Sequence, residues 1–103
     1  MREQIEKLVA EELARCLELH GGFASHHEAH SVMQEEIEEA EEQLIDISNA
    51  HASLWRDIRK GNGIYTSAIL EIHGRAIEAA MELVQVSAMS LKWLKLMDKE
   101  KAP

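Results

Sequence analysis

The sequence predicts an all-α protein with three main helices, of which the second and third are long. Its single proline is Pro103, so the residue that breaks helix interiors is missing from every long stretch. Glycines occur only at positions 21, 22, 61, 63 and 74. Between them, apolar residues recur at the three- and four-residue spacings of amphipathic helices. A chain of 103 residues fits one domain, and we expect it to span residues 1–103.

Residues 2–19 are predicted to form the first helix. Its apolar side consists of Ile5, Leu8, Val9, Leu13, Cys16 and Leu17, and the glycines that follow end the pattern. Cys16 is the only cysteine, which excludes an intramolecular disulfide. On an apolar helix side it is interpreted as a small apolar residue rather than as a nucleophile.

The second helix is predicted to begin at about residue 26 and to end at the Gly61–Asn62–Gly63 turn. Ser25 and Glu28 have the spacing of a capping box, in which the serine oxygen accepts from the Glu28 amide and the glutamate side chain reaches back to the Ser25 amide. A heptad seam runs along this helix: Met33, Ile37, Ala40, Leu44, Ile47, His51, Leu54 and Ile58. A kink at residues 48–49 is the alternative to a continuous helix.

The third helix is predicted over residues 66–98. It carries two adjacent lines, one with Leu70, Ile77, Val84 and Leu91 and one with His73, Ala80, Ser87 and Leu94. We expect His51 and His73 to hydrogen-bond within the core or to each other. The second helix is about 50 Å long if continuous, whereas a compact globule of this size is about 35 Å across. We therefore expect a homodimer or higher homo-oligomer, in which the seams complete helical bundles.

Net charge and the lengths of the uncharged runs argue against nucleic-acid and membrane partners. The chain has 11 Lys and Arg against 19 Asp and Glu, a net charge of −8, which disfavours binding to nucleic acid through its phosphates. The longest run without charged residues, 61–70, is too short to span a membrane, and the N-terminus has no apolar signal core. We therefore expect a cytoplasmic protein with no nucleic-acid or membrane partner.

Acidic residues are concentrated on the second helix. No Lys or Arg lies between Arg15 and Arg56, whereas residues 35–46 are rich in Glu. Two interpretations stay open: a solvated helix side, or a divalent-cation site, because hard cations need several converging carboxylate oxygens. Glu36 and Glu39, at i and i+3, lie beside the apolar seam, where they could face a neighbouring helix.

Glu82 is the most informative single position. It is the only charge in residues 79–91, and a helix that is apolar nearly all round is normally buried. A buried carboxylate must be neutralised, paired or metal-bound. Gln85, one turn further on, shares its side of the helix. Two helices that each present such an i, i+3 pair to a common groove provide an oxygen-rich Mg²⁺ site.

Three motifs together resemble the MazG-like branch of the all-α nucleoside triphosphate pyrophosphohydrolases. They are Gly22-Phe23-x-Ser25-x-His27-Glu28-Ala29, then Glu35-Glu36-x-x-Glu39, and finally Glu82-x-x-Gln85. The family's hallmark is Glu-Glu-x-x-Glu on one helix and Glu-x-x-Asp on a later one, around Mg²⁺. The resemblance covers roughly residues 21–98. Gln85 stands where the family has aspartate, and the stretch between the motifs is longer than in a minimal member.

The resemblance implies a hydrolase that cleaves a nucleoside or deoxynucleoside triphosphate between the α and β phosphates, giving the monophosphate and pyrophosphate. The implied metal ligands are Glu36, Glu39, Glu82 and Gln85, with Glu35 as the catalytic group, either a further ligand or a residue that orients water. The implied cofactor is Mg²⁺, with Mn²⁺ as an alternative, and the implied partner is a nucleoside triphosphate or a related phosphorylated small molecule. Candidate phosphate-binding residues are Arg56, Arg59, Lys60 and Arg75, for which ordinary surface charge is the alternative.

Other functions remain open at this stage. An amide adds no negative charge, so Gln85 is also compatible with a non-catalytic helical oligomeric module whose metal site is degenerate. A di-iron bundle is disfavoured because its Glu-x-x-His pairs are missing. His26 and His30, at i and i+4, offer a transition-metal site as a further alternative.

Overall fold

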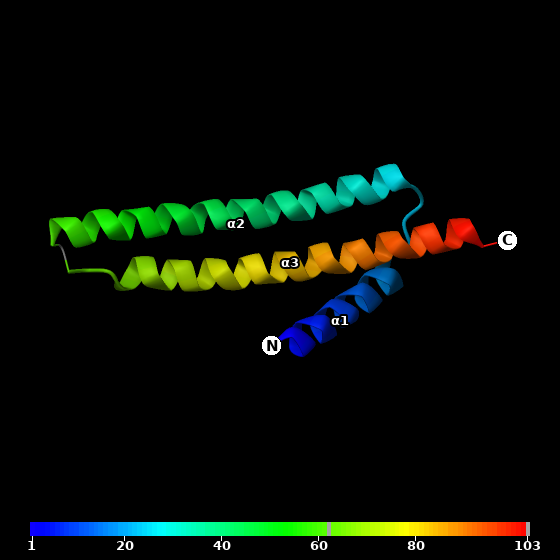
Figure 1. The fold of residues 1–103 in the computed structure, drawn as a ribbon, viewed down its shortest axis with the longest axis horizontal. Coiled ribbons are helices and arrows are strands. Elements are labelled where there is room, and N and C mark those ends of the chain that lie inside the picture. The colour runs from blue at the N-terminus through cyan, green and yellow to red at the C-terminus, as the bar shows by residue number, and fades with distance from the viewer. Residues whose placement is uncertain (62, 103) are drawn as a thin grey trace.

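The computed structural model describes residues 1–61 and 63–102, so Asn62 of the predicted turn and Pro103 lie outside the described residues. This part of the chain forms three helices, α1 (Arg2–His20), α2 (His26–Lys60) and α3 (Thr66–Lys101), and no strand. The predicted all-α class with three helices is confirmed. α2 and α3 form a long antiparallel hairpin, and α1 packs on the C-terminal half of α3, away from α2 (Figure 1). Within the described residues, no helix combines the length and apolar character needed to cross a membrane.

Local sequence sets both ends of α2. Ser25 Oγ accepts from the Glu28 amide at 3.1 Å, as predicted. The return bond differs from the prediction: the Glu28 carboxylate accepts from Ala24 N–H, at 3.4 Å, because in the extended backbone around Ser25 it is this N–H that faces the glutamate. At the other end, Gly61 adopts left-handed backbone (φ 71°), which a residue without a Cβ tolerates. Between these ends the helix continues through residues 48–49 without a break.

The side of α2 that faces α3 differs in part from the predicted seam. Two heptad lines are buried or half-buried: Met33, Ala40, Ile47 and Leu54, as predicted, and Glu36, Gln43, Ala50 and Asp57. They form the interface, because among the helices of residues 1–61 and 63–102 α3 alone packs on α2. The predicted line of Ile37, Leu44, His51 and Ile58 is exposed instead. The single chain therefore buries the neighbouring line and leaves this part of the predicted seam uncovered, so its burial in a homo-oligomeric bundle stays a prediction.

Side-chain size explains the difference. Ala40 and Ala50 on α2 and Ala79 on α3 are buried, and small residues in a contact let two helices approach closely. Turning α2 by one residue brings Ala50 into the contact in place of His51. His51 and His73 are both exposed, so the expectation that they hydrogen-bond in the core is not met within a single chain.

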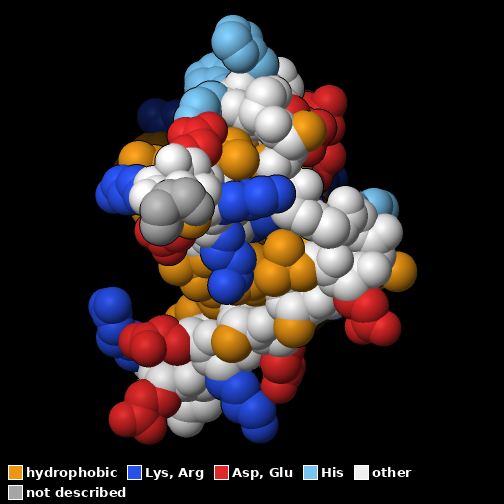
Figure 2. Space-filling view, turned by 90° about the vertical axis from the view of Figure 1, so that its right-hand side faces the viewer, with side chains coloured by type: hydrophobic (Ala, Val, Ile, Leu, Met, Phe, Trp, Pro, Cys, Tyr) orange, Lys and Arg blue, Asp and Glu red, His pale blue; other side chains and the backbone are white. Residues whose placement is uncertain are grey.

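The apolar core lies at the end of the hairpin where all three helices meet. Its buried members come from every element there: Val9, Cys16, Phe23, Ala29, Ala88, Met89 and Leu96. Figure 2 views this end and shows the histidines gathered over the start of α2, with hydrophobic side chains between α3 and α1. In the part of the chain that the structure describes, α1 does not extend over the other half of the hairpin, so the outer sides there stay uncovered.

A hydrogen-bonded chain ties the start of α2 to the end of α3. Trp93 Nε1 donates to His26 Nδ1 at 2.8 Å, and His26 Nε2 lies 3.0 Å from Glu100 Oε2. The indole is a donor only, so Nδ1 must accept and Nε2 must carry the proton that is donated to Glu100. Both nitrogens of His26 are therefore engaged, which argues against the transition-metal site predicted as an alternative with His30.

We expect Ser25→Ala to lower the free energy of unfolding by about 1 kcal/mol, because the amide of Glu28 loses its capping acceptor. Urea unfolding followed by circular dichroism measures this change. The matched control is Ser48→Ala, an exposed position inside α2, where alanine is the better helix former. Equal losses in the two variants would contradict a capping role for Ser25.

Candidate metal centre

Three glutamates converge where α2 packs along the middle of α3. Glu36 and Glu39 of α2 and Glu82 of α3 each offer a carboxylate oxygen, and these oxygens all lie within 4.8 Å of one another. Glu36 and Glu82 are half-buried, whereas Glu39 is exposed at the edge. The hairpin thus brings Glu82 to two other residues of the predicted ligand set that lie more than forty positions earlier in the sequence.

The three carboxyl groups hold protons more tightly than ordinary glutamates. Burial is the main cause that raises the pKa of Glu36 and the pKa of Glu82. The neighbouring Glu82 carboxyl raises the pKa of Glu39, first by a hydrogen bond and then by its charge. All three shifts favour the neutral form, through burial and through the neighbouring carboxyl groups. A bound cation would remove that penalty.

Gln85 joins the cluster from the next turn of α3. In the orientation that satisfies its neighbours, its amide nitrogen donates to Glu36 Oε2 at 2.6 Å and to Glu82 Oε2 at 3.1 Å. An amide nitrogen is not a metal ligand, so the amide would have to turn over to present its oxygen to an ion. Its role as a ligand stays a prediction, while its contact with the carboxylates is direct.

The chemistry of this donor set fits a hard divalent cation. Carboxylate and amide oxygens are the ligands that Mg²⁺ takes from proteins, usually one or two carboxylates together with water and phosphate. Among the described residues, no Lys or Arg forms an ion pair with Glu36, Glu39 or Glu82. The cluster therefore has oxygen ligands available and no positively charged side chain that compensates them.

The remaining predicted site residues lie outside this cluster. Glu35 is exposed and is not part of the group of three, although its charge contributes to the raised pKa of both Glu36 and Glu39. Glu35 is thus close enough to act on the site from its rim. Its catalytic role stays a prediction.

The predicted phosphate-binding residues are not brought to the carboxylates within one chain. Arg56, Arg59 and Lys60 are exposed in the last turns of α2, and Arg56 is about 25 Å along the helix from Glu39. Arg59 instead lies over the Trp55 ring, 5.7 Å from its centroid. These three residues are therefore remote from the cluster.

Arg75 lies nearer but is already engaged. It pairs with Asp46 at 2.9 Å and with Glu71 at 3.6 Å, and it donates to Gln43 Oε1 at 3.4 Å. Two turns of α3, about 10 Å, separate it from Glu82. Binding a phosphate through Arg75 would require breaking these contacts.

Sequence reasoning missed a cavity of about 330 Å³ that adjoins the carboxylates. Glu36 and Gln85 line it from the cluster side, and Arg15, Phe23 and Lys92 also contribute to its walls. The sequence feature that could have indicated this cavity is Lys92. It follows directly after the nearly uncharged stretch around Glu82 and lies two turns beyond Gln85. Only the packing of α1 and its loop against α3 turns this lysine into part of a cavity.

Cys16 also lines this cavity, and its surroundings keep it protonated. Burial and a hydrogen bond to Glu12 raise the pKa of the thiol. Since the thiolate is the reactive form, this environment disfavours a nucleophile. The interpretation of Cys16 as a small buried residue agrees with its place in the core.

Comparison with known proteins adds no relative: no family model, no curated protein and no solved structure matches this chain. The likeness to the MazG-like pyrophosphohydrolases therefore rests on the motif residues. The geometry of Glu36, Glu39 and Glu82 is independent of that likeness, because it comes from the packing of α2 on α3.

We expect Glu82→Gln to stabilise the metal-free protein at neutral pH. The pKa of each carboxyl in the cluster is raised above the ordinary 4.5, so the folded state keeps protons that the unfolded state has lost. The free energy of unfolding therefore falls as the pH rises above about 4.5. In EDTA, the advantage of Glu82→Gln over the wild type should grow across this range, as measured by thermal melts at several pH values.

In the presence of Mg²⁺, we expect the wild type to be more stable than Glu82→Gln. At about 100 times its Kd, a cation bound to the folded state adds about 2.7 kcal/mol, which we expect for the wild type and not for Glu82→Gln. Glu42→Gln, an exposed position on the same helix, is the control and should respond to Mg²⁺ as the wild type does. An equal response of Glu82→Gln would mean that the ion binds elsewhere.

Proposed function

We propose that this chain is a Mg²⁺-dependent nucleoside triphosphate pyrophosphohydrolase of the MazG-like type. It would cleave a nucleoside or deoxynucleoside triphosphate between the α and β phosphates to give the monophosphate and pyrophosphate. The observation that carries the proposal is the convergence of Glu36, Glu39 and Glu82 from two helices, beside a cavity of ligand size. The motif resemblance supplies the reaction type.

Each residue has a defined task in this proposal. Glu36, Glu39 and Glu82 hold the cation, which when bound neutralises phosphate oxygens and favours attack by water. Glu35, at the rim, orients the attacking water. Water forms the new bond to the α phosphorus as the α–β phosphoanhydride bond breaks. Pyrophosphate leaves with the electron pair of that bond, and the proton lost by the water passes to the solvent. Gln85 positions two of the carboxylates through its amide nitrogen.

The shape of the chain supports assembly into a homo-oligomeric bundle. It extends 68 × 27 × 20 Å with a radius of gyration of 18.4 Å, whereas a compact domain of this length has about 13 Å. Its surface of 7615 Å² exceeds by about 1,700 Å² that of a compact monomer of equal mass. A stable interface buries about 800 Å² per partner, so one further copy could cover much of this excess.

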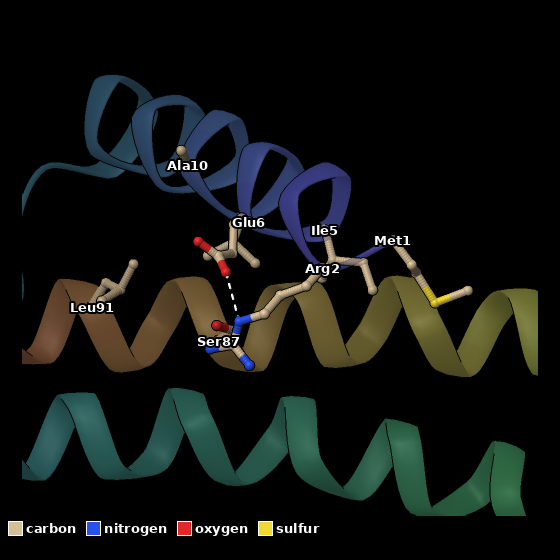
Figure 3. Close-up of a pocket in the computed structure, with 8 residues that line it drawn as sticks. Met1, Arg2, Ile5, Glu6, Ala10, Ser87 and Leu91 are labelled. Carbon is tan, nitrogen blue, oxygen red and sulfur yellow. Dashed lines mark hydrogen bonds and ion pairs between the residues drawn. The ribbon is translucent and has the colours of Figure 1, made fainter.

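Apolar side chains that a second copy could cover lie on both long helices. Leu44 of α2 is 52% exposed and Ile77 of α3 is 50% exposed, and each belongs to an apolar heptad line. Beside the second line, α1 and α3 enclose a groove lined by Ile5, Val9 and Leu91 among others (Figure 3). In such an assembly, Arg56, Arg59 and Lys60 could reach a carboxylate cluster only from another copy, since they are remote within one chain.

A non-catalytic helical assembly module is the second candidate, and Gln85 favours it. Its amide donates to two carboxylates at once, which partly satisfies them without any cation. Such a module would keep the hairpin and its apolar lines while binding Mg²⁺ weakly. The two candidates differ in whether the cluster binds a cation and cleaves substrate.

We expect a screen of nucleoside triphosphates with Mg²⁺ or Mn²⁺ to yield pyrophosphate and a monophosphate. Glu36→Gln should lower the rate by about 100-fold or more, because changes around metal ligands alone cost about 10–100-fold. Glu42→Gln removes the same charge at an exposed position of α2, so it is the control and should cleave substrate at the wild-type rate. Release of orthophosphate, or no cleavage of any substrate, would contradict the proposed reaction.

We expect light scattering at micromolar concentration to give at least twice the chain mass of 11.7 kDa. Leu44→Glu should shift the protein toward the single-chain mass, because it places a charge in an apolar contact. Asn49→Glu adds the same charge at an exposed position on another side of α2, and should leave the assembly intact. A wild-type mass near 12 kDa would exclude the homo-oligomer.

A further inference from the structure

Lys92 is the buried lysine of α3. Its exposed fraction is 6%, and its ammonium lies over the Phe23 ring, 4.2 Å from the centroid. It forms no hydrogen bond or ion pair with any other residue in 1–61 and 63–102. Lysines are almost never this buried without a charged partner, and the face of one aromatic ring compensates a cation only in part.

The open space beside Lys92 is the cavity next to the carboxylate cluster. Lys92 lines it together with Phe23, Glu36 and Gln85. Gln85 and Lys92 are seven residues apart on α3, which places them on the same side of the helix and about 10 Å apart. The cavity is thus lined both by Glu36 of the cluster and by a buried lysine. Its volume of about 330 Å³ is at the lower end for small-molecule sites.

The charges around the cavity favour one kind of ligand. Arg15 also lines it, but its guanidinium is already held by Glu12, with Nε 3.0 Å from Oε2. Lys92 is therefore the cation there without a carboxylate partner among the described residues. Glu12, Glu28 and Glu36 would repel a bare anion, so an anionic ligand gains most if it brings a divalent cation to the carboxylate cluster.

We propose that this cavity binds the magnesium complex of a polyphosphate chain, with the cation at Glu36 and a phosphate oxygen at the Lys92 ammonium. This inference rests on the proposed function and deepens it, because it names the residue that holds the substrate's phosphates. Lys92 takes the task that Arg56, Arg59, Lys60 and Arg75 cannot perform within one chain. Phe23 holds the ammonium at the cavity wall before the ligand arrives.

Calorimetric titration with inorganic pyrophosphate in the presence of Mg²⁺ tests this site. Lys92→Met keeps an unbranched side chain on Phe23 and removes the charge. It should weaken pyrophosphate binding by about tenfold or more, the value of a hydrogen bond to a charged group. Lys92→Arg should retain most of the binding. Lys95→Met, an exposed lysine three residues further on, removes the same charge and should leave the affinity within about twofold.

A second measurement uses the wild-type protein, so it does not depend on how a variant folds. Reductive methylation followed by mass spectrometry reports how readily each lysine reacts. Pyrophosphate with Mg²⁺ should protect Lys92 and not Lys95. Equal protection of both lysines, or equal loss of affinity in Lys92→Met and Lys95→Met, would overturn the proposal.

The outcomes separate this inference from the proposed function. If Mg²⁺ stabilises the protein but pyrophosphate binding is absent or independent of Lys92, the phosphate site is wrong and the metal centre stands. If pyrophosphate binds through Lys92 while Glu82→Gln has no effect on Mg²⁺ stabilisation, the phosphate site at Lys92 stands and the metal centre at the glutamates is wrong.

Discussion

The close contact between α2 and α3 sets the positions of all the other features. Buried Ala40, Ala50 and Ala79 let the two helices lie near each other. This contact turns the polar line that contains Glu36 toward α3, at the level of Glu82. A bulkier residue in place of these alanines would push the helices apart and separate the carboxylates.

The same contact lowers the stability of the metal-free chain, because it brings three carboxylates together. Burial and mutual repulsion raise the pKa of all three carboxyl groups in the cluster, so the fold is less stable at neutral pH than it would be with neutral residues there. A hairpin without a cation would gain stability by losing one of these carboxylates. Under the proposed function, the bound cation offsets this penalty.

α1 has a different role from the hairpin. It packs on α3 and, with the loop that carries Phe23, contributes to the walls of the cavity that Lys92 lines. The hairpin alone would leave this lysine in solvent, where it would be an ordinary surface charge. The part of the site that contains Lys92 therefore depends on the packing of α1. The carboxylate cluster depends on the contact between α2 and α3.

The sequence by itself determined the number of helices and both ends of α2, whereas α3 continues to Lys101, three residues beyond its predicted end. Ser25 caps α2 and Gly61 ends it, because capping and left-handed backbone are local properties of a few residues. The i, i+3 spacing that puts Glu36 and Glu39 on one side of a helix is equally local.

Only the tertiary structure decided which side of each helix is covered. The apolar heptad pattern favours the line of Leu44, but the chain packs the line of Ala50, one residue away and mostly polar, against α3, because the small Ala50 side chain fits the contact. In the same way, the local sequence places Lys92 on the same side of α3 as Gln85 but does not show that it is buried while Lys95 is not. The packing of α1 and Phe23 buried the first and left the second exposed, because burial depends on neighbours that are distant in sequence.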